Sequence, residues 1–212
     1  MSNKFPLKPD HECSRCSRLR SFILQNRLKE PGWHNGPVNS FGDISARLLI
    51  VGLAPGLRGA NRTGRVFTGD HSGDLLYSTL IKFGLTKVKY EQKVKDSLIL
   101  DNCRITNAVR CLPPKNKPTG SEIKKCAPFL ISEMETMKNL KVILALGVLA
   151  HGAILTAIKK PKSSYKFAHN TLHHVDNFII ANSYHCSRYN MNTRRLTEDM
   201  FHDVFKNIMF YL

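Results

Sequence analysis

Four short runs of mostly apolar residues recur along the chain, and each is followed by a polar loop or by a segment of helical spacing. The runs lie in residues 46–54, 103–111, 141–147 and 177–185. Apolar runs without regular polar alternation are typical of strands that are buried on both faces of a parallel sheet. We therefore predict these four segments as the strands of one sheet.

Between these runs, apolar residues recur at helical spacing. The helices that we predict cover residues 17–29, 71–83, 121–137, 148–160 and 194–211, the third of them capped by Ser121. Strands that alternate with helices indicate a parallel α/β sandwich with helices on both faces of the sheet. We expect a single domain over residues 1–212, with a loose N-terminal arm that carries cysteines.

Composition narrows the class of protein. Of the 212 residues, 42% are hydrophobic and 23% are charged, which is typical of a globular domain. No apolar run approaches the ~20 residues of a membrane span, and the first residues have no apolar stretch of a signal peptide. We expect a monomer in a reducing cytoplasm without membrane association. The net charge of +16 indicates a polyanionic partner such as a nucleic acid.

Ligands of an open parallel sheet bind at the carboxyl ends of its strands. The stretch GLAPGLRGANRTGRVFTGD, residues 52–70, follows the first strand and has one acidic residue, Asp70. It lacks the G-x-G-x-x-G of dinucleotide sites and the G-K-[ST] of a P-loop. Its first turn is either structural or a close approach to a ligand. Asp70 is either a helix cap or a carboxylate that positions a water molecule.

Two other strands also end in polar side chains. NAVRC closes the second strand and contains Asn107, whose amide either satisfies backbone groups or reads the edge of a flipped base. His185 closes the fourth and has the chemistry to stabilise a developing anion. Phe67 lies in the first loop, either as a loop anchor or as a platform for a base. If the topology holds, all of these residues converge on one site.

The chain has six cysteines and no recognisable secretion signal, which favours metal ligation over disulfides. Cys13 and Cys16 have C-x-x-C spacing, and Cys111 and Cys126 flank a proline-rich loop. Spacing alone does not distinguish zinc from an iron–sulfur cluster. Cys103 and Cys186 lack such partners, and we expect them to pack as small apolar side chains.

Taken together, these motifs resemble the uracil-DNA glycosylase superfamily, and within it family 5, the B-type enzymes with a [4Fe–4S] cluster. The resemblance rests on residues 52–73 and on three later blocks, ITNAVRCLPPKNKPTGSEIKKCAPFL, LALG and SYHCSRYNMNTRRLT. It implies a three-layer α/β/α fold around a four-stranded parallel sheet. It also implies a monofunctional DNA-repair enzyme that flips uracil, and other deaminated bases such as hypoxanthine, out of DNA and hydrolyses the N-glycosidic bond, leaving an abasic site.

The resemblance also implies roles for residues of this chain. Cys13, Cys16, Cys111 and Cys126 would hold a structural [4Fe–4S] cluster. Asp70 would orient water and His185 would stabilise the departing base, while the first turn, Leu53-Ala54-Pro55, has no polar catalytic group. Base contacts would come from Gly52, Ala54, Phe67 and Asn107. DNA contacts would come from Arg62, Arg65, Ser187, Arg188, Tyr189, Asn190, Met191 and Asn192.

Two other functions are compatible with the residues themselves. A non-catalytic iron–sulfur protein that binds nucleic acid would share the charge and the cysteines. A nucleotide-hydrolysing enzyme would use the glycine-rich loop, but the missing G-K-[ST] argues against it.

Overall fold

The computed structural model describes residues 5–87 and 97–212. A sheet in the order β2-β1-β3-β5-β4 forms the middle layer. Its parallel strands are β1 (Leu48–Gly52), β2 (Cys103–Asn107), β3 (Val142–Leu146) and β5 (Phe178–Ser183). Each lies within an apolar run of the sequence, and β1, β2 and β3 are buried at every position. These four strands confirm the predicted α/β class.

The sheet has a fifth strand that the sequence analysis did not predict. Strand β4 (Leu172–Val175) pairs antiparallel with β5 at one edge of the sheet. Val175 pairs with Phe178, so Asp176 and Asn177 form a two-residue turn, and Asp176 has a positive φ of 49°. An edge strand needs no continuous apolar run, since Leu172, His173 and His174 are partly or fully exposed.

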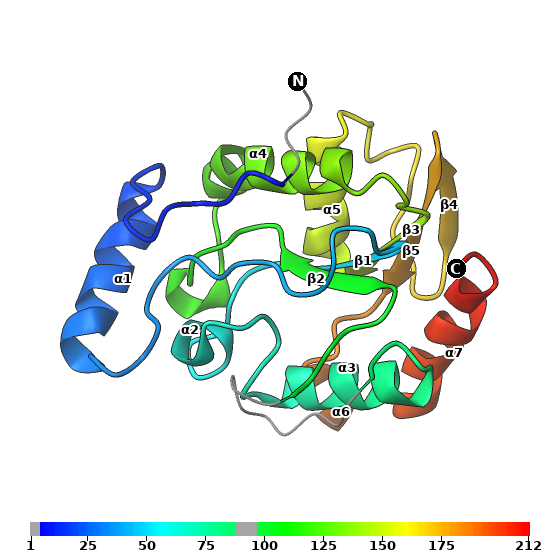
Figure 1. Cartoon of the computed structure of the whole chain (residues 1–212), viewed down its shortest axis with the longest axis horizontal. Helices are drawn as coiled ribbons and strands as arrows, with labels where there is room; N and C mark the ends of the chain where they lie inside the picture. Colours follow the sequence, from blue (N-terminus) through cyan, green and yellow to red (C-terminus); the bar gives the residue numbers. More distant parts are fainter. Residues whose placement is uncertain (1–4, 88–96) are drawn as a thin grey trace.

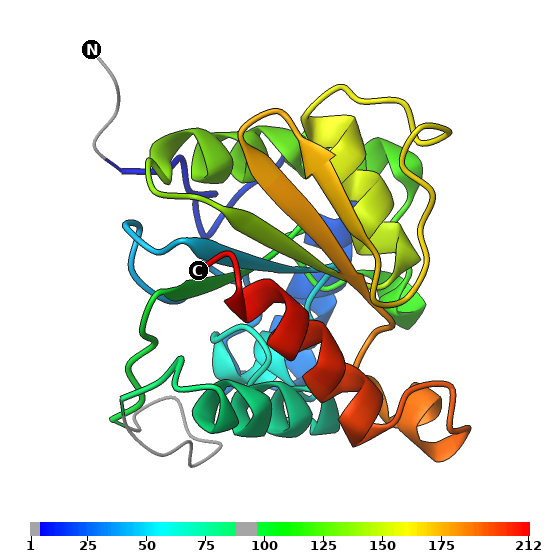
Figure 2. The same ribbon diagram turned by 90° about the vertical axis from the view of Figure 1, so that its right-hand side faces the viewer.

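Helices cover both faces of the sheet (Figures 1 and 2). Helices α3 (His71–Lys82) and α7 (Glu198–Met209) pack on one face, against a core that includes Leu48, Ile50 and Leu144. Helices α4 (Gly120–Thr136) and α5 (Val148–Ala157) pack on the other, against Leu49 and Ile143. Alternate residues of each strand therefore serve different layers, which is the geometry of a three-layer α/β/α sandwich.

The remaining helices are peripheral or short. Helix α1 (Ser17–Lys29) packs through Leu19 into a small cluster with Val109, Cys126 and Phe129. Helix α2 (Ala60–Thr63) lies in the first loop, a 3₁₀ turn covers Pro114–Asn116, and α6 (Arg188–Asn192) follows His185. Among the described residues, every helix is too short or too polar to cross a bilayer.

Two predicted helix boundaries were wrong. Helix α4 is capped by Thr119 rather than Ser121, because Thr119 and Glu122 form a reciprocal capping box. The predicted helix over residues 194–211 begins later, at Glu198, where the Thr197 hydroxyl accepts a hydrogen bond from the Met200 N–H. In both cases the helix starts directly after the residue whose side chain satisfies a free backbone N–H of the first turn.

Candidate active site

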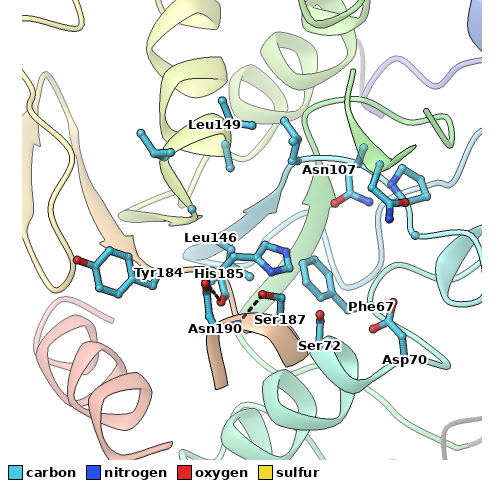
Figure 3. Close-up of a pocket in the computed structure, with 18 of the residues that line it drawn as sticks. Phe67, Asp70, Ser72, Asn107, Leu146, Leu149, Tyr184, His185, Ser187 and Asn190 are labelled. Carbon is cyan, nitrogen blue, oxygen red and sulfur yellow. Dashed lines mark hydrogen bonds between the residues drawn. The ribbon is translucent and has the colours of Figure 1, made fainter. Parts of the chain in front are cut away.

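A cavity of about 450 Å³ opens at the carboxyl ends of the parallel strands. Its walls come from the segments that follow β1, β2, β3 and β5, and Figure 3 shows the side chains that line it. Asp70, His185, Phe67 and Asn107 all contribute to this lining. The predicted convergence of strand-end residues is therefore what the fold produces.

Asp70 is both a helix cap and a cavity residue. Its backbone is extended, and its Oδ1 accepts a hydrogen bond of 3.1 Å from the Gly73 N–H at the start of α3. Its Oδ2 leans over the loop that follows β1: a Cβ on Gly59 would lie 2.1 Å from this oxygen, and one on Gly56 would lie 3.3 Å away. The two interpretations of Asp70 are thus compatible, because each carboxylate oxygen faces a different group.

We expect Gly59→Ala to displace the Asp70 carboxylate, because the added methyl group would occupy the space of Oδ2. Burial lowers the pKa of His185, and the charge of Asp70 acts in the opposite direction and raises it. Moving the carboxylate away should therefore lower the pKa of His185 further, which NMR titration of the histidine resonances measures.

The control for this experiment is Gly32→Ala, since nothing lies within 4 Å of a Cβ at Gly32. A folded Gly59→Ala protein with an unchanged pKa of His185 would show that the position of Asp70 does not depend on this glycine.

Phe67 and Asn107 meet at the end of β1. Gly52 pairs in register with Asn107, and a Cβ on Gly52 would lie 2.4 Å from Asn107 Oδ1 and 2.7 Å from the Phe67 ring. Only glycine at this position lets both side chains occupy the wall of the cavity. Among the described residues, no hydrogen bond engages the side-chain amide of Asn107, so this buried amide keeps its donors and acceptor for a ligand.

His185 lies between the two ends of the cavity. Its ring stacks near the Phe67 ring, with centroids 6.1 Å apart and planes 29° from parallel. Because its pKa lies below the usual range, the imidazole is neutral at neutral pH and has one N–H to donate. A neutral donor beside an aromatic platform suits the stabilisation of an anion that forms during a reaction.

The segment after His185 is ordered by its own polar side chains. The Asn190 amide donates a hydrogen bond of 2.8 Å to the His185 carbonyl oxygen, and the Asn190 N–H donates to Ser187 Oγ at 3.3 Å (Figure 3). Met191 packs partly buried against the core, whereas Tyr189 is 72% exposed. Of the predicted DNA contacts here, Arg188, Tyr189 and Asn192 are the outward-facing ones.

The two arginines predicted to contact DNA from the first loop differ in exposure. Arg62 is exposed, and its Nε donates to the Arg58 carbonyl oxygen. Arg65 is only 7% exposed; its Nε donates to Thr68 Oγ1 at 2.8 Å, and its guanidinium lies 5.2 Å from the centre of the Phe41 ring. Aromatic packing therefore buries the Arg65 side chain, and its contact with a phosphate stays a prediction.

Several cavity residues were missed by the sequence analysis. They are Ser72, Asn116, Phe167, Tyr184 and Arg195. Tyr184 directly follows β5, so its place at a strand end was a usable signal. Asn116 belongs to a proline-rich loop and has a positive φ of 55°, whereas nothing local marks Phe167 or Arg195.

The four cysteines predicted as ligands line a second, small cavity beside α1. Burial, followed by the neighbouring thiols, raises the pKa of Cys111 to about 12. Burial also raises the pKa of Cys126 to about 11, although its Sγ accepts a hydrogen bond of 3.3 Å from the Arg110 N–H. Within residues 5–87 and 97–212, no group of three or more His, Cys, Asp or Glu side chains is placed to hold a metal ion.

The two other cysteines lie elsewhere and bond to backbone. Cys103 Sγ lies 3.5 Å from the Leu85 carbonyl oxygen, and Cys186 Sγ lies 3.4 Å from that of Ser72. Both are fully buried, which confirms that they pack as small side chains.

Comparison with known proteins adds independent information. Residues 39–208 match the family described as the uracil DNA glycosylase superfamily. A type-5 uracil-DNA glycosylase of Thermus thermophilus is 45% identical over 200 residues, covering 91% of this chain and 90% of that protein. Type-5 enzymes of Pyrobaculum aerophilum and Mycobacterium leprae are 37% and 38% identical, each over 92% of this chain and over 86% and 89% of their own lengths.

Proposed function

Since the chain belongs to the uracil-DNA glycosylase superfamily, we propose that it is a DNA-repair glycosylase that excises uracil from DNA and leaves an abasic site. The observation that carries this proposal is the single cavity in which Asp70 and His185 meet Phe67 and Asn107. A charged carboxylate, a neutral donor, an aromatic platform and a free amide are the groups that hydrolysis of an N-glycosidic bond requires.

We assign the binding of the extruded base to Phe67 and Asn107. An extruded uracil would stack on the Phe67 ring, as bases do on aromatic side chains. The Asn107 amide has both a donor and an acceptor, so it can pair with a carbonyl and an N–H of the pyrimidine edge. Backbone groups of Gly52 and Ala54 lie at the same wall and complete the base contacts.

Bond cleavage falls to His185 and Asp70. As the bond between C1′ and N1 breaks, its electron pair moves onto the base, and the His185 N–H donates a hydrogen bond to the resulting uracil anion at O2. The positive charge left on the sugar is offset by the Asp70 carboxylate. Asp70 then orients a water molecule, which adds to C1′ as its O–H bond breaks and its proton passes to the Asp70 carboxylate. Since no lysine lines the cavity among the described residues, no amine is placed for a lyase step, and the enzyme is monofunctional.

Binding to DNA falls to exposed basic residues and to the segment after His185. The net charge of +16 supports attraction to the phosphate backbone, and Arg62 and Arg188 are exposed near the cavity. Tyr189, 72% exposed, is the residue that we propose as the wedge in the gap left by the extruded base. Ser187, Asn190 and Met191 hold the loop that carries it.

We further propose that Cys13, Cys16, Cys111 and Cys126 hold a [4Fe–4S] cluster. In support, all four thiols line one small cavity, which Arg15, Arg20, Arg110 and Lys125 also line, so cations would offset the negative thiolates. When bound, the cluster would crosslink the N-terminal arm to the segment after β2. Six free cysteines also suit a reducing cytoplasm.

Substrate breadth is a second proposal about the same cavity. Leu53, Ala54 and Pro55 line it with apolar side chains and backbone, so the first turn has no side chain that tests the exocyclic groups of the base. The cavity of about 450 Å³ also leaves room for a purine. We therefore include hypoxanthine among the substrates.

The proposed function is tested by base release from labelled duplexes that contain one uracil, one hypoxanthine or no lesion. We expect strand cleavage of the uracil duplex only after alkali, because a monofunctional enzyme leaves the abasic strand intact. Protein with measured iron and sulfide content and measured DNA affinity is used. If such protein releases neither base, it is a nucleic-acid-binding protein without this activity.

A further inference from the structure

Two residues that line the cavity, Arg195 and Tyr184, belong to a group of three stacked side chains whose third member is His169. The Arg195 guanidinium carbon lies 4.8 Å from the centre of the Tyr184 ring. The Tyr184 ring also stacks on the His169 ring, with centroids 4.9 Å apart and planes 13° from parallel. The Tyr184 N–H also donates a hydrogen bond of 3.1 Å to His169 Nδ1, which ties the two residues together. Three separate loops are therefore joined at this point.

The part of the cavity next to Arg195 has a basic side chain, whereas the part next to Asp70 has an acidic one. Of the described residues that line the cavity, only Asp70 and Arg195 are of a formally charged type, one acidic and one basic. Figure 3 shows Tyr184, on which Arg195 stacks, and Asp70 on opposite sides of His185. Leu146, Val148 and Leu149 also line the cavity, and their apolar side chains offer no hydrogen bond.

Arg195 has no structural partner that explains its position. It is exposed, and among the described residues no acid or carbonyl oxygen accepts a hydrogen bond from its guanidinium. What the structure does give it is a cation–π interaction with the face of the Tyr184 ring. An exposed arginine normally loses side-chain entropy when it binds, and stacking on a ring reduces that loss by fixing the planar fork in advance. The fork then presents its N–H groups outward at the mouth of the cavity.

We propose that Arg195, held by Tyr184, binds a phosphodiester group of the damaged strand beside the extruded nucleotide. A phosphate has two oxygens that match the guanidinium fork, and it is the anion that DNA offers at the mouth of a base pocket. Since its ring already stacks on Arg195 and on His169, Tyr184 acts as a positioning residue for this arginine rather than as a platform for a base. This inference rests on the proposed function, since it takes DNA as the ligand.

The test is the salt dependence of binding to a duplex that contains one abasic-site analogue, measured between 50 and 200 mM salt. Losing one phosphate contact reduces the slope of log K against log salt by about 0.9. We expect Arg195→Ala to show this reduction. Arg195→Lys should retain the slope but bind more weakly, because an ammonium group lacks the bidentate, stacked geometry.

Two further variants make the result specific. Tyr184→Leu should weaken binding and leave the slope unchanged, because the cation remains but is no longer held. Lys138→Ala removes an exposed cation near the amino end of β3, far from the cavity, and should change neither quantity. The conservative Arg195→Lys variant keeps the test valid if Tyr184→Leu proves unstable.

Two outcomes would overturn the inference. Weaker binding of Arg195→Ala with an unchanged slope would mean that the guanidinium stacks on a base, and no change at all would mean that it does not touch DNA. These outcomes are separate from the proposed function, because the measurement is of binding only. Base release by the wild type would stand in either case.

Discussion

Replacing Asp70 by asparagine should lower the single-turnover rate of uracil release by about 10²–10⁴-fold, the contribution of a positioned catalytic base. Asparagine has nearly the same shape and is an equally good N-cap, so its side-chain oxygen can still accept from the Gly73 N–H. What is lost is the negative charge next to the sugar and the basic oxygen that faces Gly56 and Gly59. Affinity for uncleaved DNA should stay about the same, since the effect is confined to the transition state.

The control for this prediction separates the cap from the chemistry. Thr197 caps α7 in the same way, through a hydrogen bond from the Met200 N–H, but does not line the cavity. Thr197→Ala should therefore cost about 1 kcal/mol of stability and leave the excision rate unchanged. Equal losses of DNA affinity and excision in Asp70→Asn would count against a catalytic role for this carboxylate.

The largest effect on stability is expected at Glu133, in the middle of α4. This buried carboxylate forms ion pairs with Arg104 of β2 and, at 2.8 Å, with Arg110, and it accepts a hydrogen bond of 2.7 Å from Ser40. Glu133→Gln would leave two buried arginines without their counter-charge. Breaking a buried pair in this way costs about 3–5 kcal/mol, which urea unfolding measures as a lower free energy of unfolding.

A matched variant and the pH dependence make this prediction specific. Glu135 lies on the same helix but is exposed, so Glu135→Gln should change the free energy of unfolding little. Burial raises the pKa of Glu133, but the charges of Arg110 and Arg104 and the bonds from Ser40 and Arg110 outweigh this, so its pKa lies below the usual range. The stability that Glu133 contributes is therefore present above the ordinary pKa of a glutamate and is lost as the pH falls through the lowered value.

That loss with falling pH should be absent in Glu133→Gln. If the wild type and the variant lost stability in parallel as the pH fell, or if Glu133→Gln cost no more than Glu135→Gln, the ion-pair network would not be what holds α4 to β2.

The parallel strands were predictable because their signal is local. Strands β1 and β3 are buried and apolar at nearly every position, and each parallel strand lies inside the run that predicted it, including β2, which carries Arg104, Thr106 and Asn107. Strand β4 and helix α6 carry no such signal. Strand β4 is a half-exposed edge strand. Helix α6 has five residues, and its cap, Ser187, is recognisable only from the hydrogen bond that it accepts from the Asn190 N–H.

Which arginines are exposed for a ligand was harder to predict from the sequence than where the strands lie. The type of a side chain is readable from the sequence, but its burial depends on residues far away in the chain. Arg65 is held inside by Phe41 and Tyr77, and Arg195 is held at the cavity by Tyr184. One was predicted to contact DNA and is buried, while the other was not predicted and is exposed at the cavity.

By itself, the sequence determined the fold class and the order of the motifs, because periodicity and strand-end position are properties of short segments. It also predicted that Asp70, Asn107 and His185 lie at one site, and all three line the same cavity. Only the tertiary structure decided that Asp70 caps α3 with one oxygen and leans over Gly56 and Gly59 with the other. The physical reason is that a contact between distant segments depends on how whole layers pack. The spacing of residues along a short segment does not contain these packing distances.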